Sequence, residues 1–148
     1  KIKRNTTGSE IDEAARKFLK EIGLDYAHGT GHGVGYFLNV HEGPPGISKN
    51  NKEKLKEGMI VSNEPGYYEN GKFGIRIENL IRVKKNKTQL KFEDLTTVPI
   101  DKNLIEKNLL NKNEINWLNT YHSNVFNKLK KYMNKFELLE LRKYCSNI

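Results

Sequence analysis

Three histidines and two glutamates are the residues of this sequence best suited to hydrolytic or metal chemistry. His28, His32 and His41 lie in one glycine-rich stretch, and Glu64 and Glu78 follow in separate segments. Imidazole and carboxylate groups bind divalent cations, and both can transfer a proton during catalysis. One imidazole and two carboxylates are therefore the candidate ligands of a metal site.

The spacing of these residues also leaves structural interpretations open. His32 could be a hydrogen-bonded core histidine, and Glu64 could be an exposed turn residue. Glu78 is predicted to lie at a partly buried position on a strand, where its carboxylate needs a cation beside it. That cation is either a metal ion or an arginine on the same strand face, Arg76 or Arg82.

Other common types of site do not fit the sequence. His28 and His32 are four residues apart, but the zinc-protease pattern H-E-x-x-H needs a Glu after the first histidine and a helix to carry it. The glycines match neither a dinucleotide-binding pattern nor a phosphate-binding loop. The single cysteine, Cys145, lies far along the chain from every candidate histidine, which disfavours a Cys-His nucleophile. A single cysteine excludes an internal disulfide and fits a reducing compartment.

The candidate residues follow a predicted amphipathic helix. Apolar spacing predicts this helix over 9–22, with a capping box of Ser9 and Asp12, a core-forming apolar stripe, and Gly23 at its end. Glycine at every second position over 29–35 disfavours a helix. It predicts a strand with one bare face, which another element can approach closely.

Further strands are predicted over 58–63, 74–83 and 90–100, and the first two should pair or lie close in one sheet. A polar loop is predicted over 67–72. From Asn113 onward a stripe of apolar residues predicts helix. The fold class is therefore α+β, with helices at both ends of a mostly antiparallel sheet.

Composition excludes several classes of protein. The chain has 148 residues, a length sufficient for one domain with a hydrophobic core. Its formal net charge is +8. No window approaches the roughly 18 consecutive apolar residues of a membrane span, so no membrane association is expected. The basic surplus is spread along the chain and forms no concentrated stripe, so no nucleic-acid binding is expected.

In combination, the motifs resemble aminopeptidase P, the X-prolyl branch of the pita-bread metallopeptidases. The similar segments are Gly31-His32-Gly33-Val34-Gly35, Asn39-Val40-His41-Glu42-Gly43-Pro44, Glu64-Pro65-Gly66-Tyr67-Tyr68 and Gly74-Ile75-Arg76-Ile77-Glu78-Asn79. The resemblance extends to the 116–122 stretch and is closest to the eukaryotic cytosolic form. It implies the C-terminal half of a pita-bread catalytic domain over 1–100, with a curved sheet, and a helical C-terminal extension over 101–148 packed on it.

The resemblance also implies roles for the candidate residues. The ligands of a dinuclear metal site match His32, Glu64 and Glu78, and Glu64 also handles the proton of the attacking water. The histidines that contact the scissile carbonyl and help to form the proline pocket match His28 and His41. All five are thus implied to act at one site.

The implied chemistry is that of a metallo-aminopeptidase. Residues that orient the carboxylates match Tyr68 and Arg76. One imidazole with several carboxylate oxygens suits hard divalent ions, most simply two Mn²⁺, which can share a hydroxide between them. The implied substrates are peptides with proline in second position, and the implied enzyme is a cytoplasmic homodimer.

The sequence departs from the family pattern in one respect. The family completes its metal site with two strand-borne aspartates from the preceding half of the domain. The aspartates before His28 are Asp12, in the predicted helix, and Asp25, in a turn. We therefore expect this chain alone to hold three of five ligands, to bind metal weakly and to lack peptidase activity.

Two alternative functions stay open. A prolidase-type dipeptidase shares the fold, although the segment from Phe37 to Pro44 favours aminopeptidase P. A non-catalytic pita-bread binding module is disfavoured because the three candidate ligands are all present.

Overall fold

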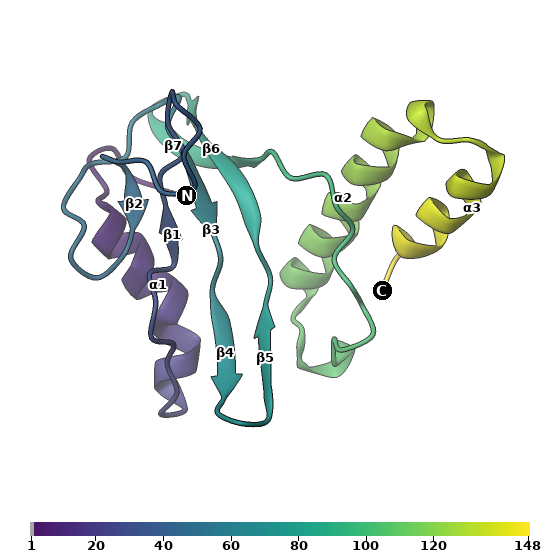
Figure 1. The fold of residues 1–148 in the computed structure, drawn as a ribbon, viewed down its shortest axis with the longest axis horizontal. Coiled ribbons are helices and arrows are strands. Elements are labelled where there is room, and N and C mark those ends of the chain that lie inside the picture. The colour runs from purple at the N-terminus through teal and green to yellow at the C-terminus, as the bar shows by residue number, and fades with distance from the viewer. Residues whose placement is uncertain (1) are drawn as a thin grey trace. The chain divides into compact units, whose positions relative to one another are not determined.

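The computed structural model describes residues 2–148 and has an α+β fold. The chain divides into two compact units, one ending at Thr96 and the other spanning Thr97–Ile148. Figure 1 shows the first unit with one helix beside antiparallel strands, and the second unit built from helices. In the part of the chain that the structure describes, no helix is both long and apolar enough to cross a bilayer.

Helix α1 (Gly8–Glu21) has the predicted length, but its start is built differently from the prediction. The capping box is formed by Thr7 and Glu10: the Glu10 carboxylate accepts the Thr7 N–H at 2.7 Å, and the Thr7 hydroxyl accepts the Glu10 N–H. The predicted box of Ser9 and Asp12 is wrong because the helix starts earlier. The predicted end is confirmed, since Gly23 has a φ of +75° and its N–H bonds to the Lys20 carbonyl.

The buried face of α1 also differs from the prediction. Its buried residues are Gly8, Asp12 and Arg16, whereas Phe18 and Ile22 of the predicted apolar stripe are 69% and 70% exposed. The reason is that this face meets polar groups of the segment 25–30. Charged side chains satisfy those groups, and apolar ones could not.

The glycine-rich segment forms a shorter strand than predicted. Strand β1 (Gly31–His32) pairs antiparallel with β2 (Gly46–Ile47). The predicted close approach is confirmed, because a Cβ on Gly31 would collide with the carbonyl oxygen of Ser62. The segment leaves the sheet after Val34, whose N–H bonds to the Ile60 carbonyl at 3.0 Å.

Three strands form the main antiparallel sheet, in the order β3 (Ile60–Asn63), β6 (Asn79–Asn86) and β7 (Gln89–Asp94). The predicted pairing of the first two is confirmed. The third strand ends earlier than predicted. Beyond Asp94 the Leu95 N–H still bonds to the Leu80 carbonyl at 2.8 Å, but the Leu80 N–H donates to the Thr96 hydroxyl at 2.7 Å, so a side chain takes one place in the ladder.

A hairpin replaces the predicted polar loop over 67–72. Strand β4 (Gly66–Glu69) pairs with β5 (Phe73–Arg76), and the turn lies between Glu69 and Phe73. The predicted strand over 74–83 is therefore two strands, because β5 pairs with β4 whereas β6 pairs with β3. Pairing between these two segments stops after Asn63 and Asn79 and resumes at Gly66 and Arg76. Pro65 lies in this interruption and lacks the backbone N–H that a ladder hydrogen bond needs.

Apolar side chains of the first unit form two small clusters. One contains Ile2, Leu55, Val83 and Leu90, and the other contains Ile47, Val61 and Ile81. Ile11 of α1 packs against both clusters. This core fixes β3 and β6, the strands that lead into and out of the interruption.

The second unit contains the 3-10 turn η1 (Lys107–Leu109), helix α2 (Lys112–Leu129), the 3-10 turn η2 (Lys130–Tyr132) and helix α3 (Lys135–Tyr144). The continuous helix predicted from Asn113 is interrupted because Asn134 starts α3 with a capping box of its own. The buried residues that hold the two helices together are Tyr121, Val125, Leu141 and Cys145.

Candidate functional site

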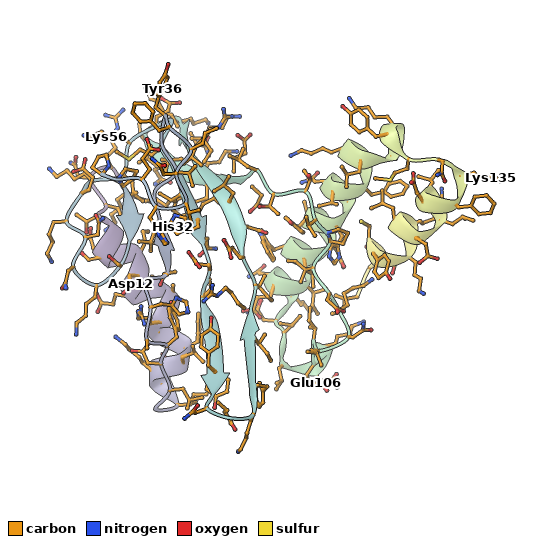
Figure 2. The ribbon with its side chains drawn as sticks, viewed as in Figure 1. Asp12, His32, Tyr36, Lys56, Glu106 and Lys135 are labelled. Atoms are coloured by element: carbon orange, nitrogen blue, oxygen red, sulfur yellow. The ribbon has the colours of Figure 1, made fainter. Side chains whose placement is uncertain are left out.

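His32, Glu64 and Glu78 come together although they lie far apart in the sequence. One possible ligand atom from each lies within 4.8 Å of the other two. His32 is on β1 (labelled in Figure 2), Glu64 directly follows β3, and Glu78 directly precedes β6. Nε2 of His32 lies 3.3 Å from Oε1 of Glu64.

The two carboxylates meet at the interruption between the strands. The register pairs Asn63 with Asn79 on one side of it and Gly66 with Arg76 on the other. Continuing that register places Glu64 opposite Glu78. Side chains at opposite positions share a face of the sheet, and two negative charges there repel each other unless a cation lies between them.

His32 is oriented with a ring nitrogen toward the acids. Its N–H bonds to the Ser62 hydroxyl at 2.9 Å, and its Nδ1 lies 3.1 Å from the Gly33 carbonyl oxygen. Because a carbonyl can only accept, Nδ1 carries the proton of the neutral ring. Nε2 therefore keeps its lone pair, which is what a metal ligand needs.

Glu64 is held from several sides. Its N–H bonds to the Thr30 carbonyl at 2.7 Å, and its carboxylate accepts from Ser62 at 2.8 Å and from Nη1 of Arg76 at 3.2 Å. The side chain is 13% exposed, so Glu64 is not an exposed turn residue. Ser62 was not predicted, although it lies two residues before Glu64 and so on the same strand face.

Glu78 is exposed, and the predicted partial burial is wrong because the chain is unpaired at this position. Neither arginine considered as its ion-pair partner serves that role. Within residues 2–148, Arg76 pairs with Glu64 and Arg82 pairs with Glu93. The Glu78 carboxylate thus faces the other two candidate ligands without an ion pair to any side chain that the structure describes.

His28, Tyr68 and Arg76 form a hydrogen-bonded chain beside the three candidate ligands. Nε of Arg76 donates to the Tyr68 hydroxyl at 2.7 Å, and that hydroxyl lies 2.9 Å from Nε2 of His28. The bond to Tyr68 raises the pKa of Arg76 above its ordinary value. His28 donates from Nδ1 to the Gly29 carbonyl at 2.7 Å, so Nε2 accepts from Tyr68.

His41 reaches the same site from the loop after β1. Its ring lies edge-on to the His32 ring, with centroids 4.4 Å apart. Glu42, which the sequence did not single out, fixes this loop. Its N–H bonds to the Gly33 carbonyl at 3.0 Å, and its carboxylate accepts the N–H groups of Phe37 and Asn39 at 3.0 and 3.2 Å.

The donor set fits a divalent cation. The described residues bring one imidazole nitrogen and two carboxylates to a common point, and oxygen-rich sets with one imidazole suit hard ions. Asp12 and Asp25 are not part of this cluster, because both pair with Arg16. The arrangement offers a metal site with two further histidines beside it.

The chain matches the descriptions of two known protein families. Residues 1–85 match metallopeptidase family M24, and residues 88–148 match the C-terminal region of peptidase M24. The chain belongs to family M24. The resemblance to aminopeptidase P is confirmed, and so is the α+β fold as part of a pita-bread domain.

M24 relatives with similar sequences include two fungal proteins named probable Xaa-Pro aminopeptidase P. The one from Laccaria bicolor is 51% identical over 154 residues, which cover 95% of this chain and 24% of the relative. The one from Tuber melanosporum is 51% identical over 146 residues, with 91% and 24% covered. The chain thus spans about a quarter of these relatives' length.

Among solved M24 structures, a cytosolic X-prolyl aminopeptidase from Caenorhabditis elegans with a di-nuclear active site matches 99% of this chain. The TM-score is 0.91 and the identity 41%, and the match covers 26% of that chain. A prolidase from Pyrococcus furiosus matches 62% of this chain and 26% of its own, with a TM-score of 0.54 and 39% identity.

Proposed function

We propose that this chain is part of an X-prolyl aminopeptidase, a metallopeptidase that removes the first residue from peptides with proline in second position. The observation that carries the proposal is the convergence of His32, Glu64 and Glu78 to within 4.8 Å. In this proposal residues 1–100 belong to the catalytic domain and residues 101–148 form its helical extension. The names of the M24 relatives support the substrate class.

The three convergent side chains would hold metal in this proposal. His32 would contribute Nε2, and Glu64 and Glu78 would each contribute a carboxylate, to two ions that are most simply Mn²⁺. When bound, such ions supply Lewis acidity, which activates water and polarises a carbonyl. The di-nuclear site named for the Caenorhabditis elegans enzyme supports two ions, and its description as cytosolic supports a cytoplasmic location.

The remaining polar residues would handle protons and position the substrate. Glu64 accepts the proton of the attacking water, and the bonds from Ser62 and Arg76 keep its carboxylate in place. His41 stabilises the developing negative charge on the scissile carbonyl and the departing proline nitrogen, and His28 helps to form the proline pocket. The Gly29 carbonyl and the Tyr68 hydroxyl bond to the two ring nitrogens of His28 and so fix its ring there.

The substrate gives a reason for a dedicated enzyme. Proline has no amide N–H and a fixed φ, so an X-Pro bond does not fit sites that bind peptides as a β-strand. The proposed enzyme acts on peptides as a homodimer, and its substrates include tripeptides and longer chains.

A prolidase is the second candidate, because prolidases share the fold of the first unit. The match to the X-prolyl aminopeptidase, however, covers 99% of the chain against 62% for the prolidase. A comparison of X-Pro dipeptides with X-Pro-containing tripeptides on the full-length protein distinguishes the two. Cleavage of dipeptides alone would favour the prolidase.

The proposed roles are tested by two substitutions in the full-length protein. Glu78→Gln should abolish Mn²⁺ retention, measured by metal analysis after gel filtration, because it replaces one of the three candidate ligands with a neutral amide. His41→Ala should lower turnover of X-Pro peptides by about 100-fold while metal stays bound. Glu13→Gln, at an exposed position on α1, is the matched control and should change neither.

Two outcomes would contradict the proposal. Equal metal loss in the Glu78 and His41 variants would show that the division of roles is wrong. Robust turnover by the purified 148-residue chain with Mn²⁺ would show that the three ligands suffice without the two aspartates.

A further inference from the structure

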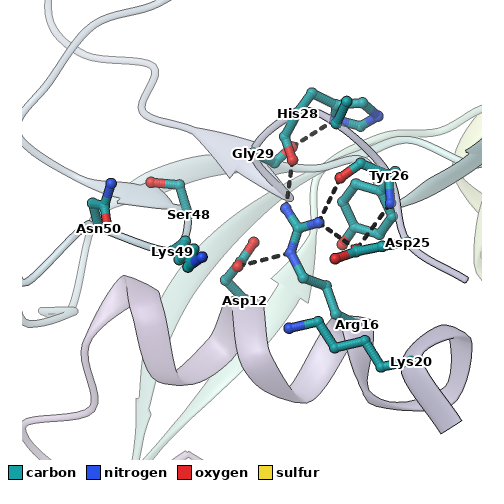
Figure 3. A pocket seen from close by; sticks show the side chains of 11 residues that line it. Asp12, Arg16, Lys20, Asp25, Tyr26, His28, Gly29, Ser48, Lys49 and Asn50 are labelled. Carbon is teal, nitrogen blue, oxygen red and sulfur yellow. Dashed lines mark hydrogen bonds and ion pairs between the residues drawn. The ribbon is translucent and has the colours of Figure 1, made fainter. Parts of the chain in front are cut away.

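The charged pair on the buried face of α1 binds the segment that carries His28. Nε of Arg16 donates to Asp12 at 2.8 Å, and Nη1 donates to Asp25 at 2.6 Å and to the Tyr26 carbonyl at 2.7 Å. Nη2 donates to the carbonyl of His28 itself. Figure 3 shows the guanidinium at the centre of these bonds, between the helix and the segment.

Arg16 also reaches the His28 ring by a second route. Its guanidinium lies over the Tyr26 ring, 3.9 Å from the centroid. The His28 imidazole also lies beside the Tyr26 ring, with centroids 4.9 Å apart. Backbone and ring of His28 are thus both placed, directly or through Tyr26, by one side chain of α1.

The side chains of Asp12 and Arg16 are both ionised at neutral pH. The side chains of Arg16 and Asp12 are 9% and 3% exposed. Burial opposes their charges, but the hydrogen bonds from Arg16 and Thr30 outweigh it and keep the pKa of Asp12 below its ordinary value. Bonds to Asp12 and Asp25 likewise raise the pKa of Arg16.

A lysine at position 16 could not make the same contacts. The guanidinium is planar and donates from three nitrogen atoms in different directions, whereas an ammonium group donates from one point. Arg16 uses all three nitrogens on four acceptors. This geometry distinguishes Arg16 from a residue that merely neutralises Asp12.

We propose that Arg16 is a positioning residue, which acts on X-Pro turnover by holding His28 in place. The inference rests on the proposed function, because it needs His28 to act on the substrate. Arg16 itself touches neither the three candidate metal ligands nor His41 among the contacts described above. Its influence on metal binding should therefore be small, and its influence on turnover large.

The first test is Arg16→Lys in the full-length protein with Mn²⁺. The turnover number for an X-Pro tripeptide should fall about 10- to 100-fold, as expected for a misplaced group, while Mn²⁺ affinity changes less than about threefold. Arg82→Lys is the matched control, since Arg82 forms an exposed ion pair with Glu93, and it should leave both quantities unchanged. An equal fall in metal affinity and turnover would overturn the proposal.

The second test is a double-mutant cycle with His28→Ala. If Arg16 acts through His28, Arg16→Lys should have little further effect on turnover once His28 is gone. Additive effects of the two substitutions would overturn the proposal. Asp25→Asn, which weakens one of the four Arg16 contacts, should give a smaller effect of the same kind and serves if Arg16→Lys does not fold.

A third measurement does not depend on activity. Imidazole ¹⁵N resonances of the full-length protein, assigned by single His→Gln variants, should shift for His28 in the Arg16→Lys variant and stay unchanged for His122. Unchanged His28 resonances would overturn the positioning role. Absence of X-Pro turnover in the unmodified protein would instead overturn the proposed function, and the His28 shift would still be observable.

Discussion

The buried side chains of helix α1 in the first unit are an aspartate and an arginine, although Ile11 also packs on the apolar core, whereas those between α2 and α3 of the second unit are mostly apolar, with Val125 and Leu141 among them. The Asp12–Arg16 pair satisfies polar backbone groups next to the candidate site. The cluster between α2 and α3 gains its stability mainly from burial, and its Tyr121 hydroxyl donates to the Val98 carbonyl at 2.8 Å. One packing surface therefore orients chemical groups, and the other stabilises a helical pair.

A histidine from each unit shows the same difference between a group oriented for chemistry and a group buried in a core. His32 is half-buried with Nε2 turned toward Glu64. His122 of α2 is fully buried, and its Nε2 accepts the Ile100 N–H at 3.1 Å. Its Nδ1 is buried without a hydrogen-bond partner among residues 2–148. The second type of histidine is a neutral core residue, so residue type alone does not identify a ligand.

The largest expected effect comes from breaking the charged pair. Asp12→Ala leaves the buried Arg16 charge without its buried partner, with only the partly exposed Asp25 beside it, and should destabilise the first unit by about 3–5 kcal/mol. Hydrogen-exchange mass spectrometry with increasing urea should show this loss in α1 peptides. Glu93→Ala, which removes surface ion pairs with Arg82 and Lys84, is the control and should cost about 1 kcal/mol or less. Equal losses would contradict the distinction between the two pairs.

An intermediate effect is expected from the apolar cluster. Leu141→Ala leaves a cavity between α2 and α3 and should destabilise the second unit by about 2–4 kcal/mol. The same exchange experiment should show faster exchange in α3 peptides and unchanged Mn²⁺ affinity. Leu139→Ala is the control, because Leu139 is 59% exposed and its truncation removes little buried surface. Reduced Mn²⁺ affinity in the Leu141 variant would show that the two units are not independent.

The smallest effect is expected from the pH dependence of His122. Burial, with a further contribution from the Lys102 charge, lowers the pKa of His122 below its ordinary value of 6.5. The unfolded chain therefore binds a proton that the folded unit does not, and stability is complete above pH 6.5 and falls as the pH drops through the lowered pKa. Exchange in α2 peptides at pH 7.5 and 5.5 measures this loss. His122→Gln should reduce the pH dependence, and an unchanged dependence would assign it to other groups.

The candidate ligands could be predicted from the sequence because their motifs are local. Glu64 before Pro65-Gly66 and Glu78 after Arg76 can be recognised without knowing the strand pairing. Their position opposite each other could not be predicted. It depends on a register that runs through a hairpin whose first strand, β4, looks like a polar loop.

The Asp12–Arg16 pair shows what the sequence leaves out. In the sequence it resembles an ordinary surface pair one helical turn apart. Its burial is decided by the carbonyl groups of Tyr26 and His28, which are backbone atoms and leave no trace in residue type. Ser62 is similar, since its link between His32 and Glu64 exists only once β1 lies against β3.

The missing side chain of Gly31 sets a limit on how this protein can diverge. Gly31, next to His32, packs against the backbone carbonyl of Ser62, two residues before Glu64. A side chain at position 31 would force these two backbone segments apart. Every nonsynonymous mutation of that codon, however conservative, changes the separation of two candidate ligands at once. Adaptation to another metal or peptide is therefore easier through the outer side chains, such as those of the loop around His41, than through this inner contact.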